Sequence, residues 1–351
     1  MIRAKRDGGE GEAVDIGKLP NQLLGQLLAR IGPDVSGRVV VGPGVGQDAA
    51  VIDMGQRLLV AKSDPITFAS DLIGWYAVHI NANDVACMGA KPAWFLATVL
   101  LPQGASQSLA EGIFDQILDA CRQMEVELVG GHIEITHRLD RPIVVGAMLG
   151  EVERDRLVRG SGAQPGDDLI LTKGIAIEGT AVLAREAADA LRRKGVAAAV
   201  LETASGYIFQ PGISVVREAL LAVEKAAVHA MHDPTEGGLA TALYEMAEAS
   251  GVGMWLEEAA IPVLPATQAV CRAAGLDPLG LMASGALLIA LPPQDADRLL
   301  AALAEAGIAA GRIGTVTPQD AGVIIGKPDG GRMALPTFAR DEVARFLAQE
   351  G

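Results

Sequence analysis

The sequence predicts a two-domain protein of the mixed α/β class (α+β with mixed sheets), because strands and helices alternate in both halves of the chain. Short apolar runs bounded by turn residues have the length of strands, and other segments repeat apolar residues at helical spacing. The chain has 351 residues, and at about 150 residues per domain this length favours two domains. Half of the residues are apolar and 21% are charged, which excludes disorder and coiled coil for most of the chain.

Charge and composition also limit the function. The formal net charge is −14, and aromatic residues make up 3% of the chain. Nucleic acid and anionic membranes are therefore excluded as partners, since phosphates attract Lys and Arg and single-stranded bases stack on aromatic rings. No run reaches the ~18 apolar residues of a membrane span, and the charged N-terminus is unlike a signal peptide. The cysteines Cys87, Cys121 and Cys271 form no CxxC pair, so we expect small buried residues in a cytoplasmic protein.

The first half of the chain contains strands and helices in alternation. A serine at position 106 is a plausible cap for the third helix. We expect strands at Arg38–Val41, Ala49–Ile52, Leu58–Ala61, Ala93–Leu101, Glu127–Val129 and Ile143–Leu149, and helices at Leu23–Ile31, Asp71–Met88 and Ser106–Met124.

A second series of strands and helices follows a charged segment rich in Gly and Pro at 151–166, where we place the domain boundary. The domains are then 18–155 and 156–351, after a flexible tail at 1–17 that closes over a filled cleft with Lys18 near the phosphates. We expect strands at Leu169–Leu171, Val228–Met231, Gly253–Leu256 and Ala286–Leu291, and helices at Gly179–Arg193, Val215–Val223, Leu239–Ala249, Asp295–Ala306 and Ala339–Leu347.

The segment GPGVGQDAAVID at 42–53 is the first candidate site. Gly44 and Gly46 lie between two predicted strands, directly before Asp48. A glycine-rich backbone can approach a phosphate and offer N–H groups to it. The segment is not a P-loop, because GxxxxGK[ST] is absent. An ordinary hairpin with Asp48 in its turn is the alternative.

Two further motifs combine carboxylates with strand or helix ends. Lys62 and Asp64 belong to KSDPIT, which we place at the end of a strand; a turn at Asp64-Pro65 is the plain alternative. Asn83 and Asp84 interrupt an apolar helix, and an unpaired buried carboxylate is costly. Asp84 therefore needs a cation, a set of donors or a ligand beside it, or else a structural salt bridge.

The last two motifs each contain a pair of adjacent glycines close to polar residues. In LVGGHIEIT, a strand leads into Gly130 and Gly131, and His132 and Glu134 would share one face of an extended chain. In MHDPTEGGLATAL, Asp233 ends a strand, and the pair Gly237–Gly238 begins a helix whose N-terminus suits an anion. An exposed hairpin and a well-capped helix are the respective alternatives.

Together these motifs predict a nucleotide triphosphate site held by a metal ion. Hard cations such as Mg²⁺ bind carboxylate oxygens and keep phosphates as partners. The carboxylates are Asp48, Asp64, Asp84 and Asp233, with Lys62 as a residue that neutralises a phosphate or as a plain surface lysine. The His132/His137 and His229/His232 pairs suggest zinc less well, since no HExxH motif or Cys/His quartet is present.

The order of these motifs resembles the aminoimidazole ribonucleotide (AIR) synthetase, or PurM-like, superfamily. The similarity runs from about Gly42 to Leu291, and the segments DPTEGGLATAL, GVGMWLEEAAIPV and AGLDPLGLMASGALLIA resemble the HypE branch of hydrogenase maturation factors. The resemblance implies an N-terminal α/β domain whose sheet pairs with a second copy in a homodimer, and a C-terminal α/β domain behind it. It also implies ATP in the cleft, with Mg²⁺ held by Asp48, Asp64 and Asp84.

Two departures from the branch concern the acceptor. The fourth motif carries His132 where relatives often have an acidic residue, and Glu134 on the same face would supply the carboxylate instead. HypE factors end in a cysteine that carries the carboxamide to be dehydrated, whereas this sequence has no cysteine after Cys271.

The sequence thus favours an ATP- and Mg²⁺-dependent enzyme that transfers the γ-phosphoryl group to an oxygen of a small-molecule or protein-bound acceptor. In this interpretation Asp84 and Asp233 act on the reacting groups, and the glycines contact phosphate or acceptor. A nucleotide-binding assembly factor with little turnover is the alternative.

Overall fold

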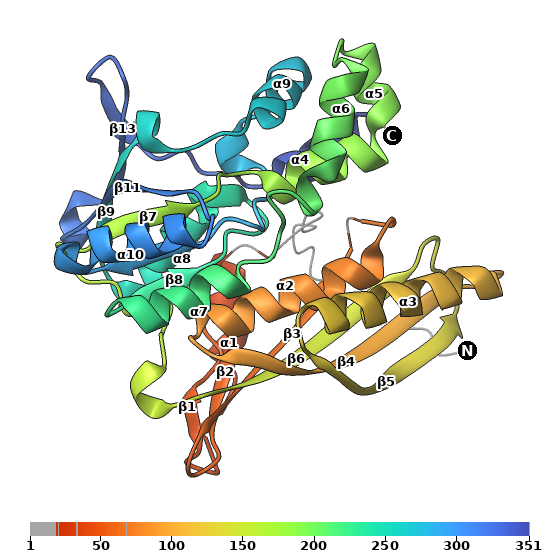
Figure 1. Ribbon diagram of the computed structural model, residues 1–351, viewed down its shortest axis with the longest axis horizontal. Helices are drawn as coiled ribbons and strands as arrows, with labels where there is room; N and C mark the ends of the chain where they lie inside the picture. The colour runs from red at the N-terminus through yellow and green to blue at the C-terminus, as the bar shows by residue number, and fades with distance from the viewer. Residues whose placement is uncertain (1–18, 20, 33, 68, 351) are drawn as a thin grey trace, which may run out of the picture.

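The computed structural model describes residue 19 and residues 21–32, 34–67 and 69–350. The predicted tail at 1–17 and the proposed role of Lys18 lie outside these residues. Within them the chain forms two sheets with helices packed on them, which confirms the mixed α/β class (Figure 1). Among the helices described, none is long and apolar enough to cross a membrane.

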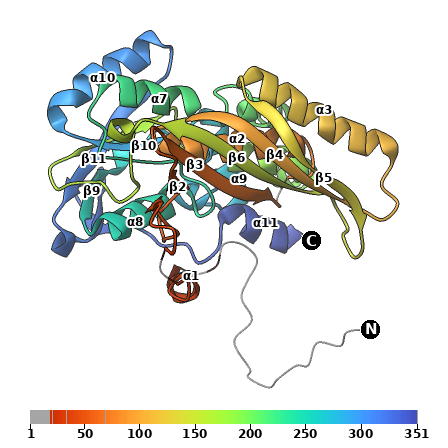
Figure 2. The same ribbon diagram turned by 90° about the horizontal axis from the view of Figure 1, so that it is seen from below.

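The N-terminal sheet has six strands in the order β1-β2-β3-β6-β4-β5. Helices α2 and α3 cover one face, and Figure 2 looks onto the opposite face. Exposed apolar side chains follow β4 and β5 (Leu96, Val129, Ile133 and Ile135). The elements are α1 (Asn21–Leu28), β1 (Val39–Val41), β2 (Ala50–Asp53), β3 (Leu58–Ile66), α2 (Ile73–Cys87), β4 (Lys91–Pro102), α3 (Gln107–Gln123), β5 (Glu127–Thr136) and β6 (Ile143–Val152).

Strand β3 is longer than the sequence predicted, and this corrects the position of KSDPIT. Lys62, Asp64 and Pro65 lie inside the strand rather than at its end. The first half of β3 pairs with both β2 and β6, but from Lys62 onward it pairs with β6 alone. A proline is tolerated there because this part of β3 is an edge with one neighbouring strand only.

Strand β5 also extends beyond the prediction, which ended it at Val129. The pairing with β4 shifts by one residue between Leu128 and Gly130, so Val129 is the extra residue of a bulge. At Gly131 a Cβ atom would lie 2.0 Å from the carbonyl oxygen of Ala97. A glycine is therefore required at Gly131 by the close approach of β4, and the strand continues through His132 to Thr136.

The C-terminal sheet has seven strands in the order β13-β12-β9-β11-β7-β10-β8. Central strand β7 is buried along its whole length, because Leu169 and Leu171 face one apolar cluster and Ile170 faces another. The strands are β7 (Asp168–Thr172), β8 (Ala230–His232), β9 (Gly253–Glu257), β10 (Leu288–Leu291), β11 (Ala310–Thr317), β12 (Val323–Gly326) and β13 (Arg332–Ala334).

The helices of this half agree with most of the predicted segments. The helix expected at 179–193 is divided at Ala187, whose φ of −129° is not helical. Two helices and three strands had no predicted counterpart: α6, α9, β11, β12 and β13. The helices are α4 (Ile177–Glu186), α5 (Ala188–Arg193), α6 (Ala198–Ser205), α7 (Val216–Lys225), α8 (Gly238–Ser250), α9 (Pro265–Ala274), α10 (Pro293–Glu305) and α11 (Glu342–Glu350).

Helix α2 lies at the junction of the two halves. All of its residues are buried, because one side packs on β3 and β6 and the other side contacts α7 and β8. Its C-terminal residues Ala86 and Cys87 belong to the same apolar cluster as Val215 and Ala219 of the second half. The polar residues of α2 are therefore placed between the two sheets.

Candidate functional site

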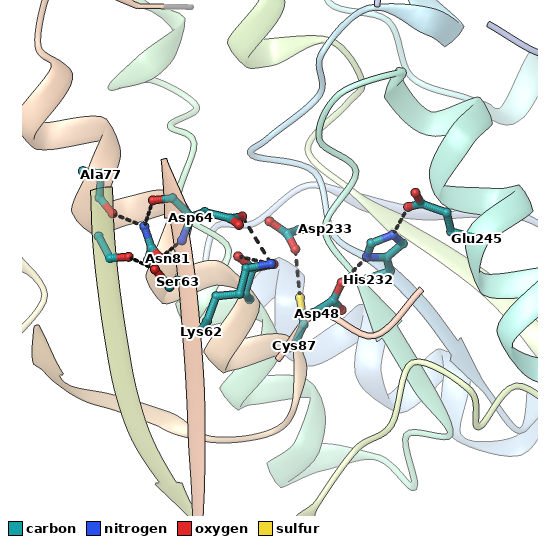
Figure 3. Close-up of polar contacts among 12 residues, drawn as sticks. Asp48, Lys62, Ser63, Asp64, Ala77, Asn81, Cys87, His232, Asp233 and Glu245 are labelled. Atoms are coloured by element: carbon teal, nitrogen blue, oxygen red, sulfur yellow. Dashed lines mark hydrogen bonds and ion pairs between the residues drawn. The ribbon is translucent and has the colours of Figure 1, made fainter. Parts of the chain in front are cut away.

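The structure brings seven of the predicted site residues, five of them charged, to one cavity of about 330 Å³ at this junction. Asp84 lies in α2. Asp48 lies in the loop before β2, Lys62 and Asp64 lie in β3, and Asp233 directly follows β8 (Figure 3). Three of the carboxylates are almost completely buried, with exposed fractions of 5% for Asp48, 4% for Asp84 and 0% for Asp233. Both halves of the chain thus contribute acidic residues to a single site.

Lys62 is the positive charge among these carboxylates. Its Nζ lies 3.2 Å from Oδ2 of Asp64 and 3.4 Å from Oδ2 of Asp84. Burial alone would lower the pKa of Lys62, but the carboxylates of Asp84, Asp64, Asp48 and Asp233 raise it above its usual value. Lys62 therefore stays protonated, and the reading of a plain surface lysine is wrong.

The backbone of Asp64 is held by the side chain of Asn81 in α2. The Asp64 N–H donates to Oδ1 of Asn81 over 2.8 Å, and Nδ2 of Asn81 donates to the carbonyl groups of Asp64 and Ala77. These bonds fix the β3 backbone against α2 at the point where the Asp64 carboxylate enters the cavity (Figure 3).

His232 and Glu245 complete the site, and the sequence analysis did not place them there. Nδ1 of His232 lies 2.7 Å from Oδ1 of Asp48, and Nε2 lies 2.9 Å from Oε2 of Glu245 in α8. Burial alone would lower the pKa of His232, but Asp48 and Glu245 raise it well above its usual value. A protonated imidazole then forms an ion pair with Asp48 and donates a hydrogen bond to Glu245, and these contacts fix the orientation of Asp48. The position of His232 next to Asp233 was the available signal.

A cation fits the donor atoms that remain. Among the residues that the structure describes, no hydrogen-bond donor reaches the buried Oδ2 atoms of Asp48, Asp84 and Asp233, and the contact of Asp84 Oδ2 is the ion pair with Lys62. Burial raises the pKa of Asp84 well above its usual value, neighbouring carboxylates add to this, and Lys62 opposes it. Burial and Asp48 likewise raise the pKa of Asp233. Such carboxylates are costly to ionise together, and a divalent cation would compensate their charge.

The glycine loop forms one wall of the cavity, as expected. Gly44 and Gly46 line it beside Gln47 and Asp48. A Cβ atom on Gly46 would lie 2.7 Å from the backbone oxygen of Glu245, and φ of Gly46 is +71°. The glycine therefore lets the loop approach α8 closely, and this approach brings Asp48 to His232.

The fourth motif is not brought to this cavity within one chain. Gly130, Gly131 and His132 line a separate, apolar cavity between β5 and α3. Gly131 and Asp64 belong to one row of paired residues across β5, β4, β6 and β3, which places them about three strand spacings, or roughly 14 Å, apart. Nε2 of exposed His132 lies 3.3 Å from Oε2 of Glu134. Neither Glu134 nor His132 contributes to the carboxylate cavity of its own chain.

Three other predicted residues are committed to the fold. Asn83 donates to the carbonyl oxygen of Ile213 and accepts from the N–H of Val215, both over 2.8 Å, so its amide joins α2 to the second half. The Gly237 N–H donates to Asp341 over 2.7 Å, and the Gly238 N–H donates to the Thr235 carbonyl. The helix start is therefore bonded to a carboxylate of the chain itself, and its contact with phosphate or acceptor stays a prediction.

A second cavity of about 480 Å³ adjoins the first, and both are lined by Asp64 and Thr235. Its other lining residues include Arg141, Glu178 and Ser284. Burial raises the pKa of Glu178 to about 8, while a hydrogen bond with Ser284 acts in the opposite direction. At neutral pH the Glu178 carboxyl group therefore carries a proton that it can donate.

Comparison with known proteins agrees with this architecture. Residues 46–152 match the model of the AIR synthase related protein N-terminal domain, and residues 164–327 match that of the C-terminal domain. The carbamoyl dehydratase HypE of Cupriavidus necator is 35% identical over 74% of this chain and 72% of its own length. The carbamoyl dehydratase HypE of Azotobacter vinelandii is 31% identical over 80% and 81%, respectively.

Solved structures show the same fold. The hydrogenase maturation protein HypE in complex with ATP superimposes with a TM-score of 0.71 at 27% identity, over 86% of this chain and 92% of that one. The expected PurM-like fold with two α/β domains is thereby confirmed.

Proposed function

The chain belongs to the AIR synthase related proteins, and on this premise we propose that it is an ATP- and Mg²⁺-dependent enzyme of the HypE type. It transfers the γ-phosphoryl group of ATP to the oxygen of a carboxamide, and the oxygen then leaves as phosphate. The observation that carries this proposal is the set of three buried carboxylate oxygens without hydrogen-bond donors, beside Lys62 and a glycine loop. The HypE relative solved with ATP, and the relatives named carbamoyl dehydratase, support the choice of reaction.

The residues of the carboxylate cavity divide the work of phosphoryl transfer. Asp48, Asp84 and Asp233 would hold Mg²⁺, with Asp64 at the outer side of the cavity. The metal would neutralise phosphate oxygens as charge moves toward the leaving ADP. Lys62 supplies a further positive charge, and the contact with His232 orients Asp48. Catalysis of this kind needs positioning and charge compensation rather than a protein nucleophile.

We assign the acceptor to the neighbouring cavity. It adjoins the carboxylates through Asp64 and Thr235, so an acceptor there lies beside the transferred phosphoryl group. The protonated carboxyl group of Glu178 is suited to donate a hydrogen bond to a carbonyl oxygen. The overall reaction converts a carboxamide and ATP into a nitrile, ADP, phosphate and a proton.

A homodimer through the N-terminal sheet belongs to the same proposal. In one chain Gly130, Gly131, His132 and Glu134 lie about three strands away from Asp64. If these residues contact the nucleotide, a second copy must supply them. The exposed apolar side chains of β4 and β5 give such a copy a surface on which to pack.

Product analysis with a labelled acceptor tests the proposal. The protein is incubated with ATP, Mg²⁺ and an S-carbamoyl cysteine peptide whose carbamoyl oxygen is ¹⁸O. We expect ADP, a thiocyanate peptide, and phosphate that carries the label, and we expect EDTA to abolish all three products. Nucleotide binding without turnover on this probe would instead support the assembly-factor alternative. Unlabelled phosphate would refute transfer to the carbonyl oxygen, and release of AMP would refute γ-phosphoryl transfer.

A further inference from the structure

A buried thiol lies beside a carboxylate of the site, and magnesium chemistry does not explain it. Cys87 is the last residue of α2, and its Sγ lies 3.6 Å from Oδ1 of Asp233 (Figure 3). Asp48, Cys87 and Asp233 each offer a ligand atom, and these three atoms lie within 4.8 Å of one another. Mg²⁺ binds oxygen and has little affinity for sulfur, so the proposed cofactor makes no use of the thiol.

We propose that Asp48, Cys87 and Asp233 form a binding site for a thiophilic divalent cation of the Zn²⁺ class. The cation would occupy the inner end of the carboxylate cavity, with two carboxylate oxygens and one thiolate as ligands. Asp48 and Asp233 line the same cavity as Lys62 and Asp64, so a fourth ligand would come from that cavity. Three protein ligands with one open position are typical of accessible zinc sites, whereas purely structural sites use four.

The one distance between two ligand atoms that is known agrees with tetrahedral coordination. Zinc binds thiolate sulfur at about 2.3 Å and carboxylate oxygen at about 2.0 Å, so a tetrahedral angle separates the two ligand atoms by about 3.5 Å. The observed separation of Sγ of Cys87 and Oδ1 of Asp233 is 3.6 Å. Little movement of either side chain is therefore needed to admit the ion.

The carboxylates have free oxygens and are held in place. Oδ2 of Asp48 and Oδ2 of Asp233 are buried without a hydrogen-bond donor, and both side chains are at least nine-tenths buried. The other oxygen of Asp48 is paired with His232, which Glu245 orients in turn. Such outer partners fix a ligand's orientation and strengthen metal binding. The thiol would lose its proton to the solvent when the cation binds.

One consequence rests on the proposed function. A thiophilic ion at this position uses Asp48 and Asp233, which the Mg²⁺-nucleotide complex also needs. Zn²⁺ would therefore compete with Mg²⁺. Because the site combines oxygen and sulfur ligands, its preference between the two metals would depend on the affinity of each for sulfur as well as on charge. The site would make the enzyme sensitive to the supply of thiophilic metal.

Absorption spectroscopy with Co²⁺ tests the site on the full-length protein without nucleotide. We expect one equivalent of Co²⁺ to produce a thiolate-to-cobalt charge-transfer band in the near ultraviolet, and added Zn²⁺ to remove it. Cys87→Ser should abolish the band and weaken Zn²⁺ binding at least tenfold more than it weakens Mg²⁺ binding. Cys271→Ser is the matched control, because Cys271 is another buried free cysteine and should leave band and affinity intact.

Several results would overturn the proposal. They are a Co²⁺ spectrum without the charge-transfer band, a band that survives in Cys87→Ser, or equal losses of Zn²⁺ and Mg²⁺ affinity in that variant. If Cys87→Ser does not fold, Cys87→Ala takes its place, since Cys87 also packs in an apolar cluster. The titration needs no ATP, so a cobalt band without nucleotide binding would refute the proposed function and leave the metal site standing.

Discussion

Replacing Asp84 with asparagine removes one charge from the carboxylate cavity and keeps the size of the side chain. Asp84 is buried, its Oδ2 lies 3.4 Å from Nζ of Lys62, and no hydrogen-bond donor reaches that oxygen. If the carboxylate holds Mg²⁺ on the phosphates of ATP, Asp84→Asn should weaken Mg²⁺-ATP binding without preventing folding.

The size of the effect follows from the kind of contact that the substitution removes. A charge-assisted contact contributes about 1.5–3 kcal/mol, and about 1.4 kcal/mol corresponds to a factor of ten. The dissociation constant should therefore rise by roughly 10- to 150-fold. Asp48→Asn should have a similar effect, and the two changes together should cost less than their sum, because both residues would bind the same metal.

The stability of the ligand-free protein should hold or rise. Burial raises the pKa of Asp84, so its ionised form is costly in the native state. After the substitution Lys62 keeps Asp64 as a partner at 3.2 Å. A structural salt bridge would behave in the opposite way, since breaking one leaves an unpaired buried charge.

Calorimetric titration of Mg²⁺-ATP and a thermal melt of each variant decide between the two roles. Asp167→Asn is the control, because Asp167 is equally buried, pairs with His229 over 2.9 Å, and lies outside both cavities. Asp167→Asn should lower the melting temperature and leave ATP affinity unchanged. Unchanged affinity with a lowered melting temperature for Asp84→Asn would refute the nucleotide site.

Three further predictions concern stability and assembly. Burial raises the pKa of Glu178 from 4.5 to about 8. Between these pH values the native state keeps a proton that the unfolded state loses, so the free energy of unfolding falls as the pH rises. Glu178→Gln should remove this loss of stability. The melting temperature of the variant minus that of the parent should therefore be larger at pH 8 than at pH 5, and equal differences would contradict the raised pKa of Glu178. Nζ of Lys173 lies 2.7 Å from Oε1 of Glu218, and both side chains are buried. Glu218→Gln should lower the free energy of unfolding, measured by urea denaturation, by about 3–5 kcal/mol. A decrease of less than about 1 kcal/mol would show that water reaches the pair. Light scattering at micromolar concentration should give the mass of a dimer, and a monomer would remove the proposed pairing of N-terminal sheets.

Elements with a strong local pattern could be predicted from the sequence. Helix α3 begins after Ser106, whose hydroxyl accepts the Leu109 N–H over 3.2 Å, as the cap predicted. The two strands whose bounds differ most from the prediction, β3 and β5, contain Pro65 and Gly131, which usually interrupt strands. Each is tolerated for a reason that depends on neighbours: Pro65 pairs on one side only, and Gly131 lies beside the Ala97 carbonyl group.

Part of the site could be predicted from the sequence, because a carboxylate interrupts an apolar helix and another directly follows a glycine-rich segment. Asp48 and Asp84 were identified in this way, and both line the cavity. His232, Glu245 and Cys87 gave no such signal. The partner of His232 comes from the other half of the chain, and Cys87 looks like any small buried residue in an apolar helix until Asp233 is placed beside it.

The residues that build the site also hold the two halves together, so the proposed ligand binding would be coupled to domain packing. His232 of the second half pairs with Asp48 of the first, and Asn83 of α2 bonds the backbone on both sides of Ser214. A cation bound by Asp48 and Asp233 would add a further link across the same junction. Because a ligand that binds only the native state stabilises it in proportion to the logarithm of its concentration, the metal would strengthen the junction most when it is abundant. The fully buried helix α2 is thus both the support of the carboxylate cavity and the element through which metal binding would affect the whole chain.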